Sequence, residues 1–313
     1  MGCANIAQRL IIPNIRKSSR FEVVAVASRN LQKARAFANQ FNCVALEGYQ
    51  ALLNMQEIDT VYMPLPTSLH YEWITKALEA KKHILCEKSF AMNFPEAKEI
   101  IEMATRQKLV VFENFMFPYH LQIEFVKSKI NSGEIGQLRL FRSTFGFPPF
   151  EIDNNIRYKK ILGGGALLDA GAYTLMAAQL FMGSEQKIES AILNNLGNEV
   201  DFQGAIQLVN ENQLVSQLAF GFDNFYQNTI ELWGTGGKIT MERAFTAGSG
   251  YCPKIVIEKQ GVKDEVSLPE DNQCFKILED FADAIEKGEY DAKYNQILNQ
   301  AYLINQINDY AKK

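Results

Sequence analysis

The first third of this chain alternates apolar and amphipathic segments, and this alternation constrains the fold more than any other feature. Residues 21–27 (FEVVAVA) form a near-continuous apolar run, which is typical of a parallel strand covered on both faces. Because such segments recur with helix-like segments between them, we predict a doubly wound α/β domain over residues 1–116. Further strands are expected at residues 43–46, 59–63, 83–86 and 109–113, and helices at 31–41, 49–53, 68–81 (capped by Ser68) and 95–107.

The pattern changes after about Asn114. From residue 188 to 268, strand-like segments follow one another with turn signals between them, which is typical of an antiparallel sheet. We therefore predict a second, α+β domain over residues 117–313. Its other elements are expected to be a helix at 118–131, a strand at 138–146, a Pro- and Asn-rich loop at 147–162 and helices at 165–182, 273–287 and 294–310.

Composition excludes several classes of protein. The net charge is −4 and the basic residues are scattered, which argues against binding to nucleic acid or to an anionic membrane. No apolar run is expected to span a bilayer. The 5 cysteines are widely spaced without a CxxC pair, and the 3 histidines lack metal-ligand spacing. We predict a cytoplasmic protein that holds no metal ion.

The amino terminus resembles a dinucleotide-binding turn. Gly2–Ala7 (GCANIA) keeps the first glycine of G-x-G-x-x-G and has alanine at the other two places. The pair Ser28-Arg29 follows at the distance where this fold recognises the ribose, and Arg29 and Lys33 can bind a 2′-phosphate. We predict NADP rather than NAD, although a solvated helix start is an alternative reading of these cations. The predicted cofactor contacts here are Gly2, Cys3, Ala4, Asn5, Ile6, Ser28, Arg29 and Lys33.

A glycine-rich turn of this kind normally follows a strand, whereas only Met1 precedes Gly2. In the doubly wound order that first strand is central, and its omission would leave its neighbours without hydrogen-bond partners. We therefore expect a strand of about four to six apolar residues to be encoded upstream of Met1.

The stretch GGGALLDAGAY at residues 163–173 has the composition of an active-site wall. Asp169 and Tyr173 are four residues apart and project from one helical face, and Gly171 between them implies that something approaches closely. Lys88 follows the strand at 83–86, at the end where α/β folds bind ligands. A glycine-rich loop before an ordinary buried helix is the alternative.

These motifs resemble the Gfo/Idh/MocA oxidoreductase family over essentially the whole chain. Within it, the resemblance is greatest to the NDP-sugar 3-ketoreductases. The family fold is a Rossmann domain followed by an α+β domain that binds substrate and mediates oligomerisation. The motifs that carry the resemblance are GCANIA (2–7), ASRN (27–30), LCEKSF (85–90), ENFMF (113–117), FGFPP (145–149), NIRY (155–158), GGGALLDAGAY (163–173) and FGFDNFYQNTIELWGTGGKITMERAFT (220–246).

The resemblance implies roles for individual residues. Tyr173 would donate a proton to the carbonyl being reduced, Lys88 would polarise that carbonyl, and Asp169 would orient one of them or a sugar hydroxyl. The family usually has Glu-Lys-Pro, whereas this chain has Ser89, so both a cis and a trans bond before Ser89 stay open. Further contacts are expected from Pro64, Leu65, His70, Glu87 and Lys88 to the cofactor, and from Lys88, Arg157, Asp169 and Tyr173 to the substrate. A hydrogen-bonded structural histidine is the alternative for His70, and a loop arginine paired with an acid is the alternative for Arg157.

The resemblance predicts an NADP-dependent reductase that acts on a keto group of a nucleotide-linked deoxysugar. Two alternatives stay open: a dehydrogenase of a free sugar or trans-dihydrodiol, and a regulator that senses NADP without catalysis. The predicted partners are a small-molecule sugar substrate and further copies of the chain, in a homodimer or homotetramer.

Overall fold

The computed structural model describes residues 1–151 and 155–312 and divides the chain into two compact units. Unit 1 comprises Met1–Asn114 and Cys274–Ala301, and unit 2 comprises Phe115–Gln273 and Tyr302–Lys313. The first boundary lies close to the predicted one. Residues 274–301, which the sequence analysis placed in the second domain, belong instead to unit 1.

Unit 1 is built from alternating strands and helices, as predicted. Asn30 begins α2 by accepting a hydrogen bond from the Lys33 amide at 2.9 Å, and Asn93 caps α5 in the same way. The predicted cap at Ser68 is wrong, because Ser68 lies inside a 3₁₀ turn, Thr67–Leu69, and α4 begins after Leu69 without a side-chain cap. The elements are α1 (Ile12–Ile15), β1 (Ala25–Ser28), α2 (Leu31–Phe41), β2 (Val44–Glu47), α3 (Tyr49–Leu53), β3 (Thr60–Met63), α4 (His70–Glu79), β4 (His83–Cys86), α5 (Phe94–Gln107), β5 (Val111–Glu113), α8 (Gln273–Lys287) and the first part of α9 (Asp291–Tyr310).

The parallel strands of unit 1 form two separate sheets in the described residues. One contains β1 and β2, and the other runs in the order β3-β4-β5. Met1 and Gly2 lie between them: the Gly2 amide donates to the Ala27 oxygen of β1 at 2.8 Å, and the Met1 nitrogen donates to the Tyr62 oxygen of β3 at 2.7 Å.

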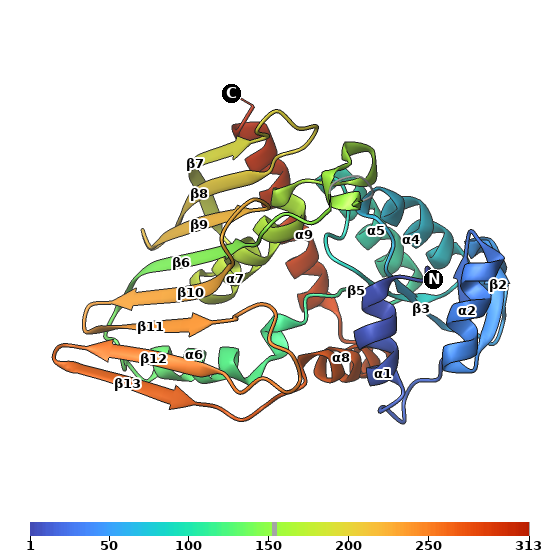
Figure 1. Cartoon of the computed structure of the whole chain (residues 1–313), viewed down its shortest axis with the longest axis horizontal. Coiled ribbons are helices and arrows are strands. Elements are labelled where there is room, and N and C mark those ends of the chain that lie inside the picture. The colour runs from blue at the N-terminus through green and yellow to red at the C-terminus, as the bar shows by residue number, and fades with distance from the viewer. Residues whose placement is uncertain (152–154, 313) are drawn as a thin grey trace. The chain divides into compact units, whose positions relative to one another are not determined.

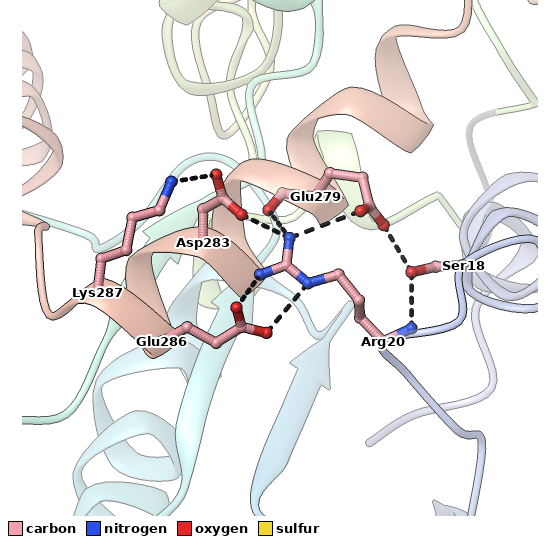
Figure 2. Close-up of polar contacts among 6 residues, drawn as sticks. All are labelled: Ser18, Arg20, Glu279, Asp283, Glu286 and Lys287. Carbon is pink, nitrogen blue, oxygen red and sulfur yellow. Dashed lines mark hydrogen bonds and ion pairs between the residues drawn. The ribbon is translucent and has the colours of Figure 1, made fainter.

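Helix α8 belongs to unit 1 because it packs on the segment that precedes β1 (Figure 2). Arg20 lies 2.6 Å from Asp283 and 2.8 Å from Glu286, and it also donates to the Glu279 backbone oxygen at 3.1 Å. Ser18 donates to the Glu279 carboxylate at 2.5 Å. Together with buried Phe281, these contacts fix the helix to the segment 18–21.

Unit 2 contains an eight-stranded, mostly antiparallel sheet within the described ranges. Its order is β13-β12-β11-β10-β6-β9-β8-β7, with β6 and β9 parallel, and the strands can be followed in this order in Figure 1. Together with unit 1, this confirms the predicted fold class. The elements are α6 (Leu121–Asn131), β6 (Leu138–Gly146), α7 (Ala172–Met182), β7 (Gln186–Asn194), β8 (Gln203–Asn210), β9 (Val215–Gly221), β10 (Gln227–Gly234), β11 (Gly237–Glu242), β12 (Lys254–Lys259), β13 (Val262–Ser267) and the end of α9.

The helix predicted at 165–182 consists of a π-helical turn, Leu167–Gly171, followed by α7, which packs on β6 and β9. Part of the loop predicted before it, residues 152–154, lies outside the described residues. Within the part of the chain that the structure describes, the stretch Lys160–Met182 is the one that could span a membrane by length and composition, contrary to the sequence expectation. However, 61% of its apolar window is buried inside the protein, as in a core helix.

Candidate functional site

The predicted dinucleotide turn lies at the carboxyl end of β1. Gly2 has a φ of +92°, and a Cβ there would lie 3.0 Å from Leu65, so the turn requires glycine. Asn5 and Ile6 begin the helix that continues through α1, and Asn5 is exposed. A helix amino terminus reached through a glycine turn presents free N–H groups to a diphosphate.

Two predicted phosphate-binding cations lie beside this turn. Arg29 and Lys33 are both exposed, at the end of β1 and in the first turn of α2. The connection between β1 and α2 contains a hydrogen bond, which the Asn30 amide donates to the Ser28 hydroxyl at 3.3 Å. Burial raises the pKa of the Cys3 thiol, which is hydrogen-bonded to Ser28. The structure therefore brings the turn and the cations together at one end of the sheet.

A buried acidic network joins the carboxyl ends of β3, β4 and β5. The Glu87 carboxylate accepts hydrogen bonds from the Tyr62 hydroxyl and from Asn114 Nδ2, both at 2.6 Å. Burial raises the pKa of the Glu87 carboxyl. Glu87 was predicted to contact the cofactor, whereas its carboxylate is hydrogen-bonded to other side chains of the protein.

Glu113 is the second carboxyl of this network. Its Oε1 accepts from the Phe90 amide at 2.9 Å, and its Oε2 is buried without a hydrogen-bond partner in the described structure. Burial raises the pKa of Glu113 to about 8, and the nearby Glu87 charge adds to this rise, whereas Lys88 opposes it. Glu113 therefore holds a proton through neutral pH.

Lys88 lies next to this network at the end of β4. It is partly exposed, and it interacts electrostatically with both Glu87 and Glu113. The peptide bond between Lys88 and Ser89 is cis, which answers the question left open by the missing proline. Lys88 therefore combines an accessible side chain with a backbone held by buried neighbours.

His70 connects the segments that follow β3 and β4. The imidazole is fully buried, with Nε2 2.8 Å from the Leu65 oxygen and Nδ1 2.9 Å from the Ser89 oxygen. It therefore joins the Pro64-Leu65 segment after β3 to the Lys88–Phe90 segment after β4. Of the two expectations for His70, a cofactor contact and a hydrogen-bonded structural histidine, the structure agrees with the second, because both ring nitrogens lie against carbonyl oxygens of the protein.

In unit 2, Arg157 and Asp169 form a pair. Arg157 Nε donates to Asp169 Oδ2 at 2.6 Å, and the guanidinium lies 4.8 Å from the centre of the Phe150 ring. The Asn155 side chain accepts from the Arg157 amide at 3.1 Å and so caps the short 3₁₀ turn that carries it. Both predicted substrate residues are thus brought together.

Glycine is required at three positions of the segment 163–171, for a different structural reason at each. A Cβ at Gly164 would lie 2.4 Å from the Arg157 oxygen, and Gly165 has a φ of +125°. Gly171 packs against the Phe220 ring of β9, and a Cβ at this residue would lie 3.0 Å from that ring. The close approach predicted at Gly171 is therefore confirmed, but it comes from a core phenylalanine and not from a ligand.

Tyr173 lies at the start of α7 in an aromatic cage. The centre of its ring is 5.4 Å from that of Phe115, 5.2 Å from Phe145 and 5.5 Å from Phe245. The cage residues are buried, whereas Tyr173 itself stays partly exposed. The cage therefore holds the ring in place and leaves part of the side chain accessible.

The candidate residues thus lie in two separate groups, Lys88 in unit 1 and Asp169 with Tyr173 in unit 2. Two members of the acidic network in unit 1, Tyr62 and Glu113, were not predicted from the sequence. The available signal was the position of polar residues at strand ends, in segments that otherwise consist of buried apolar residues.

Comparison with known proteins matches both units. Residues 1–115 match the model described as "Oxidoreductase family, NAD-binding Rossmann fold", and residues 123–240 match the GFO/IDH/MocA C-terminal domain. Over 289 residues the chain is 42% identical to the dTDP-3,4-didehydro-2,6-dideoxy-alpha-D-glucose 3-reductase of Saccharopolyspora spinosa, covering 92% of this chain and 87% of that protein.

A solved structure is similar over nearly the whole chain. It is KijD10, a 3-ketoreductase from Actinomadura kijaniata in complex with NADP and TDP-benzene, with a TM-score of 0.96, 37% identity and coverage of 99% of this chain and 95% of that one. A more distant relative is the D-xylose 1-dehydrogenase (NADP(+)) 2 of Haloferax volcanii, which is 28% identical over 92% of this chain and 89% of that protein.

Proposed function

Because this chain belongs to the Gfo/Idh/MocA oxidoreductase family, we propose that it reduces the 3-keto group of a dTDP-linked deoxysugar with NADPH. The observation that carries this proposal is the 42% identity to a dTDP-sugar 3-reductase over 92% of the chain. The second candidate is a free sugar such as D-xylose, which the 28% identity to a xylose dehydrogenase favours less.

The residues of unit 1 fit NADP. Gly2 has a positive φ, and its Cβ position is crowded, so the turn carries no side chain at this residue. A diphosphate can therefore lie close to the backbone at the helix amino terminus. Exposed Arg29 and Lys33 suit the 2′-phosphate. KijD10, which has the same fold, was crystallised with NADP. When bound, NADPH supplies the hydride.

We assign the proton to Tyr173. A hydride that reaches a ketone carbon leaves negative charge on the oxygen, and the phenol O–H donates its proton there to complete the alcohol. The Lys88 ammonium binds the same oxygen and stabilises the charge that develops on it. The aromatic cage supports this role, because it fixes the Tyr173 ring and leaves it partly accessible.

Arg157 and Asp169 serve substrate binding in this proposal. With Nε paired to Asp169, the guanidinium is held in one orientation and can direct its terminal nitrogens to a substrate phosphate. The Asp169 carboxylate can accept a hydrogen bond from a sugar hydroxyl. Their pairing at 2.6 Å, on the segments that precede Tyr173 in the chain, supports both roles.

We also propose that the protein is a cytoplasmic homodimer or homotetramer. Large apolar side chains are exposed on or next to the strands of the unit 2 sheet, including Ile192, Phe225 and Trp233. Such side chains favour contact with a second protein surface.

The test is Tyr173→Phe. We expect turnover of the dTDP-linked 3-keto sugar to fall by at least about a hundredfold, with the Kd for NADPH unchanged, because only the proton donor is removed. Tyr302→Phe, at an exposed tyrosine of α9, is the matched control. Undiminished turnover in Tyr173→Phe would refute the role of Tyr173. Faster turnover of D-xylose than of the nucleotide sugar by the unmodified protein would favour the second candidate.

A further inference from the structure

The π-helical turn that carries Asp169 is capped from a distant part of the chain. The start of a helical segment leaves backbone N–H groups that need acceptors. Ala166, which precedes the turn Leu167–Gly171, has no side chain that could accept them. The acceptors come instead from Asp201, which lies between β7 and β8 and follows Leu167 by 34 residues.

Asp201 accepts two of these N–H groups. Its Oδ2 accepts from the Leu167 amide at 2.6 Å, and its backbone oxygen accepts from the Ala166 amide at 2.8 Å. The residues on either side of it, Val200 and Phe202, are buried in the core of unit 2, and this holds Asp201 in place. Asp201 therefore anchors the start of the turn to the core.

Gly165 connects this anchor to the substrate-binding pair. A Cβ at Gly165 would lie 2.3 Å from Asp201 Oδ1, so the carboxylate can occupy its position only because this residue is glycine. The Gly165 amide donates to the Arg157 oxygen at 2.9 Å, and the Arg157 side chain pairs with Asp169 at 2.6 Å. A continuous series of contacts thus joins Asp201 to both members of the pair.

The segments that carry Arg157 and Asp201 also pack through aromatic rings. Tyr158 stacks on Phe202, with 5.1 Å between the ring centres. Burial raises the pKa of the Asp201 carboxyl, because desolvation disfavours its charge, whereas the bond from the Leu167 amide opposes this rise. An uncharged oxygen could accept the same bond without the desolvation penalty, so the acceptor and the charge can be tested separately.

We propose that Asp201 is a positioning residue for substrate binding, which fixes the turn that presents Asp169 to the substrate. This inference rests on the proposed function, in which Arg157 and Asp169 bind the substrate. Loss of the bond to the Leu167 amide allows the turn to shift. A misplacement of about 1 Å in a binding group can reduce activity by roughly a hundredfold.

The test compares three variants of the full chain. Asp201→Ala removes the acceptor, whereas Asp201→Asn keeps an oxygen for the Leu167 amide. The matched control is Asp271→Ala, because Asp271 Oδ2 accepts from the Leu121 amide at the start of α6, also at 2.6 Å and also in unit 2. If Asp201→Ala does not fold, Asp201→Ser replaces it, since its shorter side chain also withdraws the acceptor.

We expect Asp201→Ala to raise KM for the dTDP-linked 3-keto sugar at least about tenfold and to change kcat less than about threefold. The Kd for NADPH should stay within about twofold, because the turn lies in unit 2. Asp201→Asn and Asp271→Ala should keep KM within about threefold of the parent value. In an Asp169→Ala background, Asp201→Ala should change KM less than about twofold, because the residue through which it acts is already missing.

An unchanged KM in Asp201→Ala would overturn the inference. An equal rise in Asp271→Ala would also overturn it, because a general loss of stability would then explain the effect. A rise in Asp201→Asn as large as that in Asp201→Ala, or an undiminished effect in the Asp169→Ala background, would exclude the hydrogen bond and the route through Asp169. No turnover of the dTDP-linked sugar by the parent protein would refute the proposed function and the inference together, whereas the other results refute the inference alone.

Discussion

Glu113→Gln should reduce the loss of folding stability that unit 1 undergoes as the pH rises. The folded-state pKa of Glu113 is raised from 4.5 to about 8, so the folded protein retains a proton that the unfolded chain releases. The stability from this group is complete below pH 4.5 and is lost as the pH rises through 8. Each pH unit between these values removes about 1.4 kcal/mol, so the loss over the interval from pH 4.5 to 7 reaches about 3–4 kcal/mol. Gln removes this dependence because it does not titrate.

The measurement is the free energy of unfolding in urea at several pH values between 5.5 and 8.5. Gln keeps an oxygen for the Phe90 amide, so any fixed cost of its buried NH₂ group shifts all values equally. The Met1 amino group, with a pKa lowered to about 5, contributes a slope of opposite sign, but it cancels in the difference between variant and parent. The expected difference therefore changes with pH in favour of Gln.

The reasoning would be refuted by a difference that stays constant over this pH range. Glu47→Gln, at the exposed end of β2, is the control for removal of one carboxylate at the surface. A pH-dependent difference of similar size in this control would also contradict the assignment to Glu113, because the loss of any one carboxylate charge would then produce the same effect.

Two further predictions follow from the described contacts. Arg29→Ala should raise the Kd for NADPH at least about tenfold and leave the Kd for NADH within twofold, measured by fluorescence titration; equal losses for both would argue against 2′-phosphate recognition. Gly171→Ala should destabilise unit 2 by about 1–3 kcal/mol in urea unfolding, because its Cβ would lie 3.0 Å from the Phe220 ring, whereas Gly248→Ala, which has open space around it, should have little effect.

Elements defined by local sequence were predicted with close boundaries. Helix α2 begins after the Asn30 cap, and β6 and α8 have the predicted ends. Strand β1 was predicted at 21–27 but spans only Ala25–Ser28. The difference has a physical cause, because a strand ladder requires a partner, and β2 begins only at Val44, which pairs with Ala25.

The candidate site was predicted only in part, for a related reason. Lys88 and Tyr173 stand in recognisable motifs, but the environment of Lys88 depends on long-range pairing of β3, β4 and β5. That pairing brings Tyr62 and Glu113 into one network, although they are far apart in sequence. Likewise, the π-helical turn before α7 ends at Gly171, which packs against Phe220, and local periodicity encodes neither the turn nor this contact.

The composition of unit 1 has a consequence for biosynthesis. Its last segment, Cys274–Ala301, follows the whole of the unit 2 sheet in the chain. Until the ribosome has released these residues, Phe112 lacks its partner Phe281, and the Leu109 oxygen lacks the Tyr294 hydroxyl. Unit 1 is therefore the first to be synthesised but cannot be the first to be completed, and a fragment ending at Asn114 should expose apolar surface that chaperones would recognise.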